Sequence, residues 1–77
     1  MKGSEIRRIR QKLGLSKGGL ALIAGLDNVD LIIALEEEKV KPTKSTQILL
    51  RLLDTLPLKK AIELSKLIMR IAVCYES

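Results

Sequence analysis

The chain has 77 residues, 47% of them apolar, and 14 Lys and Arg against 9 Asp and Glu give it a net charge of +5. This length allows one domain with a small core, and the charge either favours an anionic partner or simply keeps a small domain soluble. One cysteine and no histidine exclude an internal disulfide and argue against a zinc site, and a single aromatic residue argues against binding single-stranded nucleic acid by base stacking.

The sequence contains no recognisable catalytic constellation, glycine-rich phosphate loop or metal site. Glu36, Glu37 and Glu38 are consecutive, so on a helix they diverge rather than converge as an acid–base pair. We therefore predict a protein that is not an enzyme and has no cofactor, catalytic residue or metal ligand. No apolar run reaches the length of a membrane span, and the first twelve residues are too basic for a secretory leader. We expect a cytoplasmic protein that makes no use of a membrane.

The first predicted helix covers residues 4–13, with Ser4 as its N-cap and Gly14 ending it. Ile6, Ile9 and Leu13 recur at helical spacing and form its buried face. The remaining positions carry four cations, Arg7, Arg8, Arg10 and Lys12. We interpret these cations as a solvated face in preference to a phosphate-contacting face.

Two short helices follow, over residues 17–24 and 28 to about 38. Ser16 is positioned to cap the first of them and Gly25 to end it, and either Asp27 or Asn28 then caps the second. The predicted buried positions are Leu20, Ala21, Ile23 and Ala24 on the first helix, and Leu31, Ile32 and Leu35 on the second. The acidic residues 36–38 are interpreted as a solvated helix end. A short helix, a glycine turn and a second capped helix form the plan of a helix-turn-helix unit.

The rest of the chain predicts a basic loop and two further helices. Pro42 stops the third helix, and Thr43 can cap a fourth over residues 44–55, with Lys44 in its first turn. The expected apolar stripe of the fourth helix is Ile48, Leu49, Leu52, Leu53 and Leu56. After Pro57 a fifth amphipathic helix runs over residues 58–74. Its apolar positions cover more than one narrow stripe, so part of that face is expected to meet a second subunit or another protein: Leu64, Leu67, Ile68 and Ile71.

Between Ile6 and about Pro57 the chain resembles the lambda-repressor-like (XRE/Cro) helix-turn-helix family. The residues that carry the resemblance are IRRIRQKLGLS at 6–16, Leu20-Ala21, Gly25, Glu36, KVKP at 39–42 and ILLRLLDTLP at 48–57. The chain is most similar to the DNA-binding half of MqsA- and HigA-type antitoxins, which repress their own operons. The resemblance implies an all-α fold of five helices in a single domain, 1–77, with a helix-turn-helix core at 4–57 and a C-terminal helix at 58–75 for dimerisation or a partner.

The resemblance also implies which residues would contact double-stranded DNA. The third helix would enter the major groove, as in a dimeric autorepressor of antitoxin or phage type. The phosphate-contacting positions would be Lys17, Lys39, Lys41 and Lys44, and the base-facing positions Asn28, Asp30, Ile33 and Ala34. The chain departs from the family pattern, since Leu35 stands where an aromatic residue is usual, Glu38 stands at the loop glycine, and the stretch from Gly25 to Pro42 is one residue longer.

A second hypothesis comes from the third helix itself, VDLIIALEEE, which is apolar and acidic where a DNA-binding helix is usually polar or basic. Ile and Ala contact only a thymine methyl group, and Asp repels phosphate. Exposed Val29 and Ile33 would then belong to a patch for a protein partner or a second subunit. Under this hypothesis the chain is a helix-turn-helix fold used for protein interaction, as a toxin-binding antitoxin or a phage-encoded inhibitor.

Overall fold

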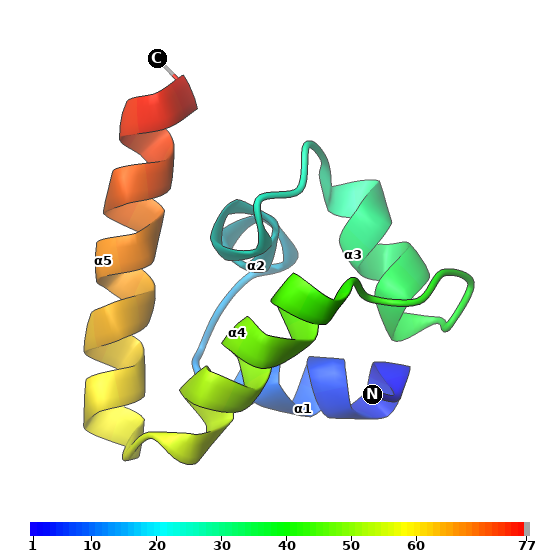
Figure 1. Cartoon of the computed structure of the whole chain (residues 1–77), viewed down its shortest axis with the longest axis horizontal. Coiled ribbons are helices and arrows are strands. Elements are labelled where there is room, and N and C mark those ends of the chain that lie inside the picture. The colour runs from blue at the N-terminus through cyan, green and yellow to red at the C-terminus, as the bar shows by residue number, and fades with distance from the viewer. Residues whose placement is uncertain (77) are drawn as a thin grey trace.

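The computed structural model describes residues 1–76 and consists of helices joined by short loops (Figure 1). Its helices are α1 (Gly3–Lys12), α2 (Lys17–Ala24), α3 (Val29–Glu36), α4 (Lys44–Thr55) and α5 (Leu58–Glu76). The predicted all-α class is confirmed. The predicted bounds of α2 and α4 match, whereas α1 begins and ends one residue earlier, α3 is shorter at both ends, and α5 continues to Glu76.

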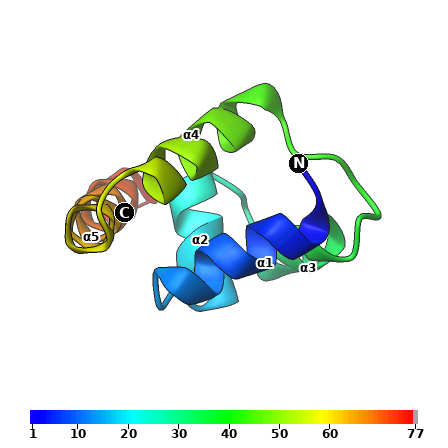
Figure 2. The same cartoon turned by 90° about the horizontal axis from the view of Figure 1, so that it is seen from below.

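An aliphatic core lies where α2 meets the other helices. α2 packs against α5 on one side and α3 on the other, while α1 contacts α3 and α4, and α4 contacts α5. Seen from below, α2 lies between α1 and α4, and α5 closes one end of the molecule (Figure 2). All five helices contribute core side chains, and Leu13 adds one directly after the end of α1. The buried core residues are Ile6, Ile9, Leu13, Leu20, Ala21, Ile23, Ile32, Leu35, Leu50, Leu53 and Ala61.

The chain bends by 98° between α2 and α3, across the short turn at residues 25–28. Among the described residues, no individual helix combines the length and the apolar character needed to cross a bilayer; α2 and α3 reach that length and composition only as this bent pair.

Local capping fixes where most of the helices begin. The side chains of Ser16, Asn28 and Thr43 accept hydrogen bonds from backbone N–H groups three residues on, at 3.0, 3.2 and 3.2 Å. Ser16 and Thr43 are confirmed as N-caps, and of the two candidates for α3, Asp27 and Asn28, the cap is Asn28. The prediction for Ser4 is wrong, because α1 already begins at the buried Gly3. A Cβ on Gly3 would lie 2.9 Å from the carbonyl oxygen of Leu35, so the start of α1 approaches the end of α3 too closely for any other residue.

Three helices end in the same left-handed turn. Gly14, Gly25 and Glu38 have φ values of 68°, 70° and 60° and follow α1, α2 and α3. In each turn the next N–H reaches back to a carbonyl five residues earlier: Leu15 to Arg10, Leu26 to Ala21 and Lys39 to Ala34. Glycine adopts this conformation readily and a residue with a Cβ does not. Glu38 therefore holds a strained backbone at the position where the family resemblance expects a glycine.

The buried faces of α3 and α4 differ from those predicted. On α3, Ile32 and Leu35 are buried as predicted, but Leu31 is exposed and Glu36 is buried instead. On α4, Leu53 is buried as predicted, but Ile48 and Leu52 are 60% and 46% exposed, and Thr46 and Leu50 are buried instead. The apolar stripe of α4 is wider than the face that α1 and α5 cover. Thr46 can occupy the inner side because its hydroxyl bonds to that of Thr43 at 3.0 Å.

Candidate nucleic-acid interface

The first turns of α2 and α3 lie next to each other. A Cβ on Gly18 would stand 3.8 Å from a methyl carbon of Val29, in ordinary contact. Lys17 is the first residue of α2 and is exposed, so its side chain starts beside the N-terminal end of α3. Gly18 meets no tight contact within the described chain, so packing does not require a glycine there.

The opposite flank of α3 borders the loop that leads to α4. A hollow of about 240 Å³ separates them, lined by Leu26, Leu31, Leu35, Val40, Lys41, Pro42, Thr43 and Thr46. Lys41 lies on the wall of this hollow, and the exposed Lys44 begins α4 directly after Thr43. The structure therefore places Lys17 on one side of α3, and Lys41 and Lys44 on the other.

The lysines of this surface differ in their charge environment. Lys39 forms an exposed ion pair with Glu37 at 3.1 Å, so its charge is partly neutralised. Within residues 1–76, Lys17, Lys41 and Lys44 form no ion pair. Three of the four predicted phosphate-contacting lysines thus retain an uncompensated charge that an anion can satisfy.

The side chains predicted to face bases are of mixed accessibility. Asn28 and Asp30 are exposed at the start of α3, whereas Ile33 and Ala34 are half-buried. The Asn28 side-chain oxygen accepts from the Leu31 N–H at 3.2 Å, so its amide NH₂ is the group available to donate. The outer face of α3 therefore presents few hydrogen-bonding groups, and its charged member is acidic.

A buried carboxylate ties the end of α3 to α1. The Glu36 side chain is 2% exposed and accepts hydrogen bonds from Arg10 Nε at 2.7 Å and from Arg7 Nε at 3.1 Å. Burial alone would raise the pKa of Glu36, but these hydrogen bonds and the two positive charges lower the pKa below its ordinary value. The interpretation of residues 36–38 as a solvated acidic end is thus wrong for Glu36.

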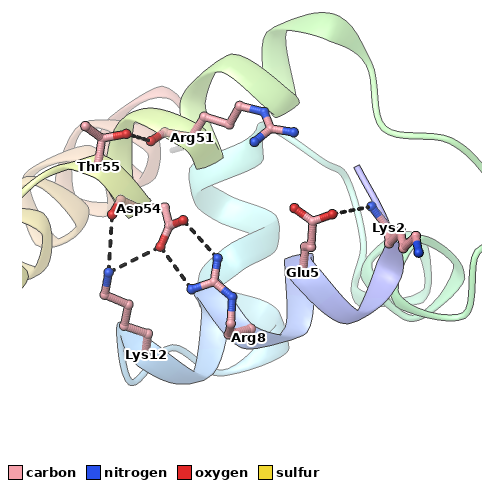
Figure 3. A network of polar contacts seen from close by, with 7 residues as sticks. All are labelled: Lys2, Glu5, Arg8, Lys12, Arg51, Asp54 and Thr55. Carbon is pink, nitrogen blue, oxygen red and sulfur yellow. Dashed lines mark hydrogen bonds and ion pairs between the residues drawn. The ribbon is translucent and has the colours of Figure 1, made fainter.

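A second carboxylate joins α1 to α4 (Figure 3). Asp54 accepts two hydrogen bonds from the Arg8 guanidinium, at 2.9 and 3.1 Å, and one from Lys12 Nζ at 3.2 Å. These hydrogen bonds, with the attraction of the two cations, lower the pKa of Asp54 to about 2. The α1 cations therefore do not form a merely solvated face: Arg7 and Arg10 bind Glu36, and Arg8 and Lys12 bind Asp54.

Both carboxylates leave a signal in the sequence. Ile32, Leu35 and Glu36 are spaced i, i+3, i+4, as are Leu50, Leu53 and Asp54. Each acid thus lies on or beside the buried face of its own helix. A carboxylate in that position needs a cationic partner to be stable, and the four cations of α1 could have been identified from the sequence as the candidates.

Comparisons with protein-family models, curated proteins and solved structures gave no match for this chain.

Proposed function

We propose that this chain is a small helix-turn-helix regulator that binds double-stranded DNA with α3 in the major groove. The observation that carries the proposal is the 98° bend between α2 and α3 across a glycine turn, with lysines on both flanks of α3. Helix-turn-helix units have crossing angles in this range, and their second helix enters the groove. The left-handed turn at Glu38, at the position of the family's loop glycine, adds support for the resemblance to the lambda-repressor-like family.

In this proposal the lysines hold the phosphate backbone on either side of α3. Lys17 contacts one strand, and Lys41 and Lys44 contact the other, while Lys39 contributes less because it pairs with Glu37. Phosphate contacts give affinity and register but carry no sequence information. Much of the binding free energy is therefore expected to depend on salt concentration.

Base recognition rests on fewer groups. The Asn28 amide can donate to an acceptor on a base edge, and Ile33 and Ala34 can contact thymine methyl groups. Asp30 lies on the same helix and opposes close approach of phosphate. We therefore expect modest discrimination between sequences, with the preferred operator rich in thymine where α3 lies. No catalytic residue, metal or cofactor is needed for this function.

The test is fluorescence anisotropy of a labelled duplex from upstream of the gene and of a scrambled duplex, at several salt concentrations. The Lys41→Ala/Lys44→Ala variant should bind both duplexes more weakly. The slope of the logarithm of its binding constant against the logarithm of salt concentration should become shallower by about two. Lys59→Ala/Lys66→Ala is the matched control, because these lysines are exposed on α5. Equal losses in the two variants would show that net charge alone matters and would contradict the proposed docking.

A specific observation also favours the alternative, a protein-interaction module. Leu31 and Val40 are exposed hydrophobic residues that line the hollow between α3 and the α3–α4 loop, and Val29 is exposed on the other flank of α3. Exposed apolar groups of this kind are typical of protein interfaces. If the wild-type chain binds neither duplex at low salt, this alternative replaces DNA binding. Leu31→Asp should then abolish capture of a toxin encoded beside the gene.

A further inference from the structure

The hollow between α3 and the α3–α4 loop reaches the edge of the core. Leu35 and Thr46 are only 6% and 7% exposed, yet both line the hollow, together with the exposed Leu31 and Val40. Its volume is about 240 Å³. Since an apolar cavity of about 150 Å³ holds a benzene molecule, this hollow has room for about ten non-hydrogen atoms. A concave, mostly apolar wall of this depth fits a small molecule better than a flat protein surface.

The polar groups of this hollow are few and are suited to an anion. Lys41 lies on its wall and forms no ion pair within residues 1–76. Thr43 Oγ1 donates a hydrogen bond to Thr46 Oγ1 at 3.0 Å, so the hydroxyl hydrogen of the buried Thr46 is left to donate. Among the described residues, no Asp or Glu lines this hollow. It therefore offers an ammonium group and a hydroxyl donor to a bound molecule, and no competing carboxylate.

A neighbouring hollow is less suited to an anion. It has a volume of about 290 Å³ and shares part of the same wall: Leu35, Val40, Lys41 and Pro42. Its lining also includes Glu38, whose carboxylate repels a second negative charge. An anion that interacts with Lys41 is therefore better accommodated in the hollow beside α3.

We infer that the hollow between α3 and the α3–α4 loop binds a small monocarboxylate with an apolar body of about eight carbon atoms, such as a medium-chain fatty acid. The carboxylate accepts hydrogen bonds from Lys41 Nζ and the Thr46 hydroxyl. The hydrocarbon chain packs on Leu31 and Leu35, which are one helical turn apart on α3. Burial of the chain favours binding, and the charged contact fixes the orientation of the ligand.

This site is connected to the proposed function through Lys41. Under that proposal Lys41 contacts a DNA phosphate, and a carboxylate bound beside it competes for the same ammonium group. The ligand should therefore weaken DNA binding about fivefold to tenfold, and DNA should weaken ligand binding by the same factor. This consequence rests on the proposed function, whereas binding of the carboxylate itself does not.

Binding is tested without DNA by titrating the full ¹⁵N-labelled chain with octanoate and following its backbone amide signals by NMR. Octanoate should bind with a dissociation constant of about 0.1–1 mM and shift the signals of the residues that line the hollow. Acetate, which lacks the chain, and octanol, which lacks the charge, should each bind at least about tenfold more weakly. The absence of shifts at about 10 mM octanoate, or shifts mainly on α5, would overturn the inference. Octanol that binds as tightly as octanoate would also overturn it, and would instead fit insertion of an apolar side chain from a protein partner.

Two substitutions test the assigned contacts. Lys41→Met keeps the aliphatic stem and removes the charge, and Leu31→Glu brings a carboxylate to the apolar wall. Each should raise the dissociation constant of octanoate at least about tenfold. Lys59→Met, an exposed change on α5, is the matched control and should leave this constant unchanged. Circular dichroism checks that the variants stay helical. Unchanged octanoate affinity in either test variant would overturn the inference.

Anisotropy titrations of the labelled duplex with and without octanoate test the effect on DNA binding. At saturating octanoate the wild type should lose affinity for DNA about fivefold to tenfold, and Lys41→Met should be insensitive. If the wild type binds no duplex, the proposed function is wrong, while the NMR titration still decides the ligand site. Equal DNA affinity with and without octanoate would overturn the competition for Lys41.

Discussion

Two groups of cations in this chain are similar in sequence and differ in their surroundings. Every cation of the α1 group, Arg7, Arg8, Arg10 and Lys12, is bound to Glu36 or Asp54. Lys17, Lys41 and Lys44, the α3-flanking lysines, form no ion pair within residues 1–76. The first group therefore holds α3 and α4 against α1, whereas the second group is available to an external anion. Net charge alone does not separate these two roles; the position of the nearest carboxylate does.

This difference between the α1 group and the α3-flanking lysines predicts that mutations at the first change stability and mutations at the second change the proposed DNA binding. Removing a carboxylate partner of the α1 group should lower the free energy of unfolding and weaken DNA binding only through loss of folded protein. Removing an α3-flanking lysine should weaken DNA binding and leave the free energy of unfolding unchanged, because surface substitutions of this kind have small effects on stability. Urea titration and anisotropy on the same variants measure the two quantities independently.

The largest expected effect is that of Glu36→Ala. It leaves the side chain of Arg10, which is only 13% exposed, without its carboxylate partner, and breaking a buried ion pair in this way costs about 3 kcal/mol. Urea denaturation measures the loss. Glu37→Ala is the control, since Glu37 is exposed and should change stability by less than about 0.5 kcal/mol. Equal effects of the two substitutions would mean that Glu36 does not hold α3 to α1.

Gly3→Ala should have the next largest effect. The added Cβ would collide with the carbonyl groups at the end of α3, and such overpacking costs about 1–3 kcal/mol. Thermal unfolding followed by circular dichroism measures the change. Ser4→Ala, at the exposed neighbouring position, should leave the melting temperature nearly unchanged. A Gly3→Ala variant as stable as the wild type would show that α1 and α3 are not in close contact there.

The pH dependence of stability reports on both carboxylates. Their pKa values are lowered in the folded chain, for Asp54 from 3.8 to about 2. The unfolded chain therefore binds protons first as the pH falls, and the stability from these groups, present above about pH 4.5, declines toward pH 2. Urea midpoints at pH 7, 5, 4 and 3 measure this decline. Asp54→Asn should reduce the slope below pH 4 and leave a residual slope from Glu36; an unchanged slope would contradict the low pKa of Asp54.

The sequence predicted the features that depend on a few neighbouring residues. Ser16 and Thr43 cap their helices within three residues, and Gly14 and Gly25 end theirs, so these assignments needed no tertiary information. The cap of α3 was narrowed only to Asp27 or Asn28, and the structure selects Asn28. The α1 ion pairs were missed because they join residues 26 to 46 positions apart. The exposed Ile48 and Leu52 were misassigned for a related reason, since the width of the face covered on α4 depends on how α1 and α5 pack.

The candidate interface also combines features that local sequence predicts with features that depend on tertiary packing. Which lysines lie near α3 followed from the local helix-turn-helix pattern and the loop sequence. The pairing of Lys39 with Glu37, and the partial burial of Ile33 and Ala34, depend on side-chain placement that periodicity does not specify.

The smallest expected effect belongs to Glu38, the residue with a left-handed backbone just after α3. Glu38→Gly should raise the free energy of unfolding by about 0.5–1 kcal/mol, because glycine adopts the φ of 60° without a Cβ clash. Glu38→Ala removes the same charge but keeps the Cβ, so the difference between the two variants in urea isolates the backbone effect. Both variants should bind DNA slightly more tightly, and equally so, because both remove a negative charge close to Lys39 and Lys41. A gain in affinity confined to the glycine variant would instead mean that the shape of the α3–α4 loop, and not its charge, limits binding.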